Sequence, residues 1–384
     1  MTPAHAPPRR YLDNAATSWP KPPVVHAAWE RAARETGAAA GRAAYASAVE
    51  AGAIRDHARR TLARFIGADP ARVALPAGGT LALNMAIHGL VRPGDRVIAT
   101  AADHNASLRP LHALARRGVI ALDVVPCDGF GHVDPAAVAA AWRPDTRLVV
   151  CTHASNVTGA VQDVAAISGV AHERGGILVL DAAQTVGLLP FDVASCGADV
   201  VCAPAHKWLL APSGAALLWA REGVEPEPFV LGGTGSASES LGMPEAFVER
   251  LEAGTCDVPA LAGLAAAVEW LEVNRLAVVG DRRRALSDEC AARLRDVAGV
   301  TVFAARAGSP IVSFTVAGHD PSEVAAVLEQ AAGVEVRSGF HCAALIHDQL
   351  GTRSGGTVRA SFGPFNAQAD VDALVATVAA LVGA

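Results

Sequence analysis

Lysine is nearly missing from this chain of 384 residues. Of its 32 basic residues only two are lysines, Lys21 and Lys207, and the other 30 are arginines. Arginine stays protonated in proteins, whereas a lysine amine can lose its proton and bond covalently to a carbonyl carbon. A retained lysine is therefore a candidate for chemistry. Lys21 lies in a turn rich in proline and is interpreted as structural, whereas Lys207 lies among apolar residues and is predicted to be catalytic.

Other scarce features exclude whole classes of protein. The seven cysteines include no Cys-x-x-Cys pair, which argues against a disulfide framework and a structural zinc site, so no metal is expected. A net charge of -6 offers no basic surface for nucleic acid. The longest uncharged apolar stretch, residues 208–220, is too short to span a bilayer, and residues 1–10 lack the apolar segment of a signal peptide. We therefore expect a soluble, cytoplasmic protein that binds neither nucleic acid nor membrane.

The middle of the chain alternates short apolar runs with alanine-rich helical segments. Buried strands are predicted at residues 96–100, 120–125, 147–152, 177–181 and 199–203. Helices are predicted between several of them, at residues 108–117, 135–142 and 164–174. Strands that are apolar on both faces and separated by helices indicate a mostly parallel sheet covered on both sides. One more strand is expected at residues 214–219, and an antiparallel direction is considered for it.

The texture changes after about residue 225 and indicates a second, smaller α+β domain. A loop is predicted at residues 232–238, helices at 260–273, 322–331 and 367–382, and strands at 301–303 and 310–316. The predicted domains are an N-terminal segment that packs with the small domain, residues 1–20, a large domain, residues 21–255, and the small domain, residues 256–384.

Two residues of the large domain point to a cofactor. Asp181 ends the predicted strand 177–181, where open α/β sheets place ligands, although an aspartate that stood alone there would equally fit a helix cap. A carboxylate for a protonated pyridine nitrogen and a lysine amine for an aldehyde, here Lys207, are what pyridoxal phosphate chemistry requires. Gln184 could then face the phenolic oxygen of the cofactor. The stretch Gly78-Gly-Thr, at the start of an apolar helix, offers backbone donors for its phosphate.

Seven ordered motifs, spread over essentially the whole chain, resemble the class V aminotransferase superfamily, and within it the cysteine desulfurase and selenocysteine lyase branch. The motifs are Tyr11-Leu-Asp-Asn-Ala-Ala, Gly78-Gly-Thr, Asp103-His-Asn, Ser155-Asn-Val-Thr-Gly, Asp181-Ala-Ala-Gln, His206-Lys and Thr357-Val-Arg-Ala-Ser. The resemblance implies an α/β fold, the pyridoxal phosphate-dependent transferase fold type I. In that fold a large domain, with a mostly parallel central sheet covered by helices, binds the cofactor, and a smaller α+β C-terminal domain carries the Cys342 loop and Arg359.

The resemblance also implies a role for each matching residue. Lys207 would form the internal aldimine with pyridoxal 5'-phosphate and later shuttle protons, Asp181 would pair with the pyridinium nitrogen, and His104 would stack on the ring. Further cofactor contacts are implied for Gly79, Thr80, Asn156, Gln184, His206 and Thr255. Thr255 would reach the phosphate of the neighbouring subunit, which implies a homodimer with shared active sites. Substrate contacts are implied for Asn14, Ala15, Asn156 and Arg359, of which Arg359 would clamp the α-carboxylate.

Cys342 is the residue that would define the substrate. It lies in Arg337-Ser-Gly-Phe-His-Cys-Ala, where Arg337 and His341 could favour the nucleophilic thiolate. This stretch resembles the active-site loop of the second group of cysteine desulfurases. The resemblance implies that Cys342 attacks the sulfur of L-cysteine, that L-alanine leaves, and that a persulfide stays on Cys342 for transfer to a sulfur acceptor, for example another protein.

Departures from the family pattern leave alternatives open. Pro204 stands where relatives usually carry a small hydroxyl residue, and Cys256-Asp257 replaces a usual Pro-Asn pair. The alternatives are a selenocysteine lyase, another pyridoxal phosphate-dependent C–S lyase, an aminotransferase or an epimerase, and a non-catalytic scaffold relative. Cys342 separates them, because the persulfide route requires this thiol whereas a transaminase or a lyase that releases free sulfide does not.

Overall fold

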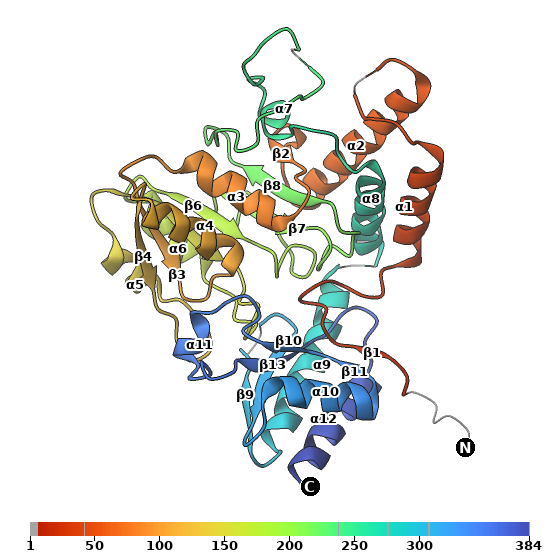
Figure 1. Cartoon of the computed structure of the whole chain (residues 1–384), viewed down its shortest axis with the longest axis vertical. Coiled ribbons are helices and arrows are strands. Elements are labelled where there is room, and N and C mark those ends of the chain that lie inside the picture. Colours follow the sequence, from red (N-terminus) through yellow and green to blue (C-terminus); the bar gives the residue numbers. More distant parts are fainter. Residues whose placement is uncertain (1–6, 42, 237, 275, 306–307, 384) are drawn as a thin grey trace.

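The structure is a computed structural model that describes residues 7–41, 43–236, 238–274, 276–305 and 308–383. Residues 1–6 of the predicted N-terminal segment and residue 237 of the predicted loop lie outside this part of the chain. Figure 1 shows a larger sheet with its helices in the upper part of the view and a smaller sheet with its helices below. In the described residues, no helix has both the length and the apolar character that crossing a bilayer requires.

A seven-stranded sheet forms the centre of the larger part, in the order β2-β8-β7-β6-β5-β3-β4. Its strands are β2 (Val73–Ala74), β3 (Arg96–Thr100), β4 (Ala121–Val125), β5 (Thr146–Thr152), β6 (Ile177–Asp181), β7 (Val200–Pro204) and β8 (Ala216–Ala220). Five neighbouring strands, β4, β3, β5, β6 and β7, are parallel, as the apolar runs predict, and β8 is antiparallel to β7. The predicted α/β class with a mostly parallel sheet is therefore confirmed.

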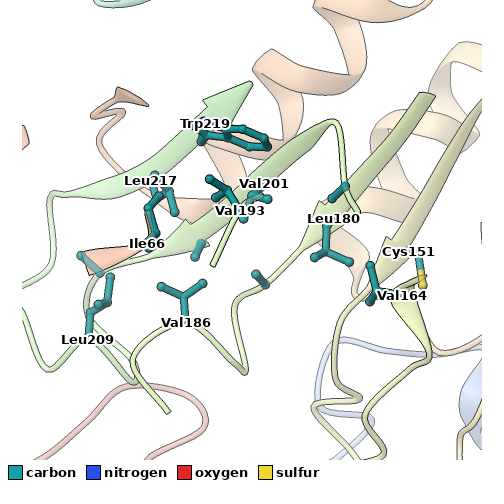
Figure 2. Packing of buried hydrophobic residues seen from close by; sticks show 14 of the residues in the cluster. Ile66, Cys151, Val164, Leu180, Val186, Val193, Val201, Leu209, Leu217 and Trp219 are labelled. Atoms are coloured by element: carbon teal, nitrogen blue, oxygen red, sulfur yellow. The ribbon is translucent and has the colours of Figure 1, made fainter. Parts of the chain in front are cut away.

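Apolar side chains cover both faces of this sheet. Successive residues of a strand point to opposite faces, and so Leu180 and Val201 pack in one buried cluster whereas Val179 and Cys202 pack in another. Figure 2 shows the first cluster, in which side chains from β5, β6, β7 and β8 meet Ile66 and several loop residues. Strands buried on both faces leave only their ends for polar side chains, and this places the site at an edge of the sheet.

The helices of the larger part are α1 (Pro23–Glu35), α2 (Ala46–Phe65), α3 (Gly79–Leu90), α4 (Asn105–Arg116), α5 (Pro135–Ala141), α6 (Val164–His172), α7 (Phe247–Leu251) and α8 (Val258–Val273), with a 3-10 turn at Pro70–Arg72. Helix α3 packs on β7 and β8, and α1 and α2 pack on α8. The helices predicted at residues 108–117, 135–142, 164–174 and 260–273 correspond to α4, α5, α6 and α8. Helices α1 and α2 were not predicted.

The smaller part is built on a four-stranded antiparallel sheet in the order β12-β13-β10-β9. These strands are β9 (Val300–Phe303), β10 (Ile311–Val316), β12 (Arg337–Gly339) and β13 (Thr357–Ser361). The helices are α9 (Leu276–Arg295), α10 (Pro321–Ala332), α11 (Ile346–Gln349) and α12 (Gln368–Val382). Near the N-terminus β1 (Arg10–Tyr11) pairs in parallel with β11 (Val334–Glu335). The N-terminal chain thereby passes along the smaller part, in a separate two-stranded sheet, before it enters α1, as Figure 1 shows.

Candidate active site

A cavity of about 360 Å³ lies at the carboxyl ends of the central parallel strands. Thr152 of β5, Asp181 of β6 and Pro204 of β7 form its floor, because the carboxyl ends of parallel strands meet at one edge of a sheet. Many of the predicted site residues line this cavity together, namely Gly79, Thr80, His104, Asn156, Asp181, Gln184, His206 and Lys207. The sequence shows only the order of these residues along the chain, and the structure shows that the fold brings them together around one cavity.

The amine of Lys207 and the carboxylate of Asp181 form the charged centre of the cavity. Burial lowers the pKa of Lys207 to about 8, and the negative charge of Asp181 opposes this effect. Burial raises the pKa of Asp181, and the positive charge of Lys207 opposes it. Each group therefore stabilises the charge of the other, while burial makes the neutral, nucleophilic amine accessible near physiological pH.

His104 presents a neutral imidazole to the cavity. It is the N-cap of α4, and its Nδ1 accepts a hydrogen bond of 2.9 Å from the backbone N–H of Ala106. The proton of the neutral ring is therefore on Nε2. Burial, and next the positive charge of Lys207, lower the pKa of His104 to about 3. An uncharged flat ring held by a helix cap is suited to cover one face of an aromatic cofactor.

The first turn of α3 offers donors for a phosphate. Helix α3 begins at Gly79, so the N–H groups of its first turn, including those of Gly79 and Thr80, have no partners inside the helix. A Cβ on Gly79 would lie 3.0 Å from the ring of Pro204, which explains why a glycine starts this helix. Pro204 itself supplies no hydrogen-bond donor here. The buried Nδ1 of His206, which has no partner in the described part of the chain, is a further atom for the phosphate.

Cys342 lies beside the cavity rather than in its wall. A guanidinium nitrogen of Arg337 donates to its Sγ at 3.0 Å, and Arg337 does line the cavity. His341 is fully buried, and burial, then the charge of Arg359, lower its pKa well below the ordinary value. His341 is thus uncharged, and Arg337 supplies the positive charge next to the thiol. Both His341 and Cys342 have positive φ angles, 51° and 59°, so this turn holds the thiol in a strained conformation.

Arg359 is brought near the site but does not line the cavity. Its guanidinium on β13 is buried and donates to the carboxylate of Asp13 at 2.6 Å and to the carbonyl of Asn156 at 2.9 Å. The Asn156 side chain in turn donates to the His341 carbonyl at 2.6 Å. Asp13 was quoted only as part of a motif, and its ion pair with Arg359 was not foreseen.

The remaining predicted residues lie elsewhere. Asn14 is fully buried and its amide donates to the Ser361 carbonyl at 2.9 Å. The backbone N–H of Ala15 donates to the Ser361 hydroxyl, also at 2.9 Å. Thr255 lines a separate hollow of about 280 Å³, which shares the residues Ala77 and Gly214 with the cavity.

Two further residues beside the site were given no role in it by the sequence analysis. Asp103 is fully buried, and its carboxylate accepts from the N–H groups of Thr100 at 2.7 Å and Thr152 at 2.5 Å, which joins the ends of β3 and β5 below the cavity. Lys21, interpreted above as structural, is partly buried, and its amine donates to the His206 carbonyl at 3.3 Å. Burial lowers the pKa of Lys21 to about 8. Its rarity was the only signal in the sequence.

Comparison with known proteins gives the family. The family model described as aminotransferase class-V matches residues 10–374. The chain belongs to the class-V aminotransferase family. The resemblance predicted from the motifs is thereby confirmed.

Relatives within the family carry a consistent name. A protein from Methanothermobacter thermautotrophicus named "Probable cysteine desulfurase" is 35% identical over 387 residues, which cover 97% of this chain and 94% of that protein. The apo structure of a cysteine desulfurase from Thermococcus onnurineus has a TM-score of 0.90 at 29% identity and covers 97% of this chain and 94% of that one. The cysteine desulfurase CsdA from Escherichia coli has a TM-score of 0.86, with the same identity and coverage. The predicted fold is that of these structures.

Proposed function

We propose that this class-V family member is a pyridoxal 5'-phosphate-dependent cysteine desulfurase that converts L-cysteine to L-alanine and leaves a persulfide on Cys342. One observation carries the proposal: Arg337 lines the cavity that contains Lys207 and at the same time donates to the Cys342 thiol at 3.0 Å. A nucleophilic sulfur is thus held at the edge of a cavity built around an amine of lowered pKa. The names of the relatives support the same activity.

The residues of the cavity fit the cofactor. When bound, pyridoxal phosphate supplies an electron sink for the substrate α-carbon. Lys207 would hold its aldehyde carbon, and Asp181 would hold the proton on the pyridine nitrogen. The N–H groups of Gly79 and Thr80 would bind the phosphate, with the orphaned Nδ1 of His206 beside them. Gln184 and Asn156 would contact the phenolic oxygen or the substrate, and His104 would cover the ring.

The protein residues then divide the chemistry of the substrate among them. Arg359 would bind the α-carboxylate of the substrate once the guanidinium nitrogen that now donates to Asp13 is released from that carboxylate. The amine of Lys207 would take and return protons at the substrate carbons. The Cys342 thiolate would attack the substrate sulfur, so that an S–S bond forms, the C–S bond breaks and its electron pair stays with carbon, which takes a proton to give alanine. Atoms and electrons balance without an added oxidant, and the sulfur leaves only on transfer to an acceptor thiol.

The proposal includes a homodimer with shared active sites. Thr255 lines a hollow that shares its border with the cavity, which is where a residue of a second subunit would have to arrive. The loop that precedes α7 and Thr255 carries exposed apolar side chains, with Leu231 at 72% exposure and Leu241 fully exposed, and a second copy would cover them. A sulfur-acceptor protein and a cytoplasmic location stay predictions of the sequence.

Product analysis tests the proposed function. The cofactor-loaded protein is incubated with L-cysteine and a reductant, and equal amounts of alanine and sulfide are expected. Cys342→Ala should keep the visible absorbance of the cofactor and lose the persulfide, whereas Cys256→Ala, which changes a half-buried thiol outside the cavity, should keep both. Pyruvate and ammonia with the sulfide would indicate an eliminating C–S lyase instead, and a protein that never acquires cofactor absorbance would favour the scaffold alternative.

A further inference from the structure

The indole of Trp208 fixes the orientation of one cavity side chain. Trp208 directly follows Lys207 and is completely buried. Its Nε1–H donates a hydrogen bond of 2.6 Å to Oε1 of Gln184. An indole nitrogen is a donor only, and so the end of the Gln184 amide that faces Trp208 must be its carbonyl oxygen.

The other end of the same amide is fixed with equal certainty. Nε2 of Gln184 donates to the backbone carbonyl of Ala15 at 3.0 Å, and a carbonyl oxygen is an acceptor only. A rotated amide would face the indole N–H with its own N–H and the Ala15 carbonyl with its own oxygen, and all four groups would be buried without a partner. The amide therefore has one stable orientation, in which the second proton of Nε2 is the group left for the cavity that Gln184 lines.

Trp208 is itself held from two sides. Gly187 has a φ of +87°, and a Cβ on it would lie 2.5 Å from the carbonyl carbon and oxygen of Trp208, so the two backbones are in direct contact. The guanidinium of Arg283 on α9 lies 5.8 Å from the centroid of the Trp208 ring. Because the backbone and the ring of Trp208 are both confined, the indole N–H cannot follow a rotation of the Gln184 amide.

We infer that Trp208 is a positioning residue that makes Gln184 a hydrogen-bond donor toward the cavity. The inference rests on the proposed function, in which Gln184 faces the phenolic oxygen of the cofactor. A fixed N–H donates to the anionic form of that oxygen and stabilises it. An amide that rotates freely could instead turn its carbonyl toward the oxygen and accept a hydrogen bond from the protonated form, which would stabilise that form equally well. The donor thus lowers the pH at which the bound cofactor loses its proton.

The test is a pH titration of the visible absorbance of the cofactor-loaded protein. Trp208→Phe removes one of the two contacts that orient the amide and should raise the titration midpoint by up to about one pH unit, the full effect of one lost hydrogen bond to a charged form. Trp219→Phe, which replaces a buried indole on β8 in the apolar cluster of Figure 2, should titrate as the parent does. If Trp208→Phe also titrates as the parent does, the inference is wrong.

Two further variants separate the N–H from the ring. Benzothienylalanine at position 208 keeps the size of the ring and lacks only the N–H, so it should reproduce the shift even where the phenylalanine variant folds poorly. In a Gln184→Leu background, Trp208→Phe should cause no further shift, because the effect passes through the amide. An undiminished shift in that background would overturn the inference, whereas a parent protein that never acquires the cofactor band would contradict the proposed function itself.

Discussion

Replacing Arg283 with methionine should make the protein more stable. Arg283 on α9 is 1% exposed, and none of its three guanidinium nitrogens has a hydrogen-bond partner in the described residues. Burial lowers the pKa of this guanidinium from its ordinary value of 12.5 to about 9, and no carboxylate opposes the effect. A buried charge that has neither a counter-charge nor an acceptor destabilises the folded state.

The size of the effect follows from the pKa difference. A fall from 12.5 to about 9 corresponds to roughly 5 kcal/mol at about 1.36 kcal/mol for each pH unit. The folded protein carries this full cost at any pH below about 9, and loses it as the pH rises toward 12.5 and the folded state releases the proton. Methionine gives up the contact of the cation with the Trp208 ring, worth about 0.5–2 kcal/mol. Subtracting that contact from roughly 5 kcal/mol leaves an expected net gain of about 3–4.5 kcal/mol near neutral pH.

The assay compares free energies of unfolding in urea. Arg283→Met should unfold at higher urea than the parent near neutral pH, and the difference should shrink above pH 9. Arg59→Met is the control, because Arg59 is also buried, at 8% exposure, but pairs with both carboxylate oxygens of Glu252, at 2.6 and 3.0 Å. Its loss leaves a carboxylate unpaired and should destabilise by about 3–5 kcal/mol. An Arg283→Met protein that is no more stable than the parent would refute the reasoning.

Three more predictions concern the surroundings of Lys207. Because its pKa is about 8, the rate at which the apo protein takes up pyridoxal phosphate should rise with pH and level off above 8; a rate that still rises at pH 10, measured by absorbance, would contradict this. Lys21→Met removes a donor to the Ser18 hydroxyl and the His206 carbonyl and should lower the free energy of unfolding by about 1–3 kcal/mol, with no rescue by Lys21→Arg, whose planar fork differs in shape. Gly187→Ala, at a φ of +87° and against the Trp208 backbone, should cost more than about 1 kcal/mol in the same measurement, and an unchanged midpoint would speak against the close contact.

The central sheet and the cavity floor were predictable from the sequence for one physical reason. Strands buried on both faces must be apolar along their whole length, so a polar residue such as Asp181 is admitted only at a strand end. Topology then brings such ends together. The scarcity of lysine added an independent signal, because it marked Lys207 without any knowledge of the fold.

The helices α2 and α9 and the contacts of Arg359 were beyond the sequence. Alanine and arginine occur on both the buried and the exposed faces of helices, so segments rich in them show little periodicity of apolar residues. The ion pair between Arg359 and Asp13 joins residues at opposite ends of the chain, and no local pattern encodes it. The same holds for Trp208, whose partner Gln184 was assigned a role while the group that orients it was not.

The N-terminal strap, residues 11–21, shows why the site depends on parts that carry no catalytic side chain. The carbonyl of Ala15 holds the Gln184 amide, the carboxylate of Asp13 pairs with Arg359, and the N–H of Ser18 donates to the carbonyl of His206 at 3.0 Å. Two of these three contacts use backbone atoms, which every residue has, so a sequence motif does not indicate them. The strap thus positions the proposed cofactor contact Gln184 and the peptide before Lys207 through its backbone, and the proposed substrate contact Arg359 through one side chain, that of Asp13. Its path is in turn set by the pairing of β1 with β11, a two-stranded sheet of its own, so contacts outside the central sheet fix the geometry of a cavity that belongs to that sheet.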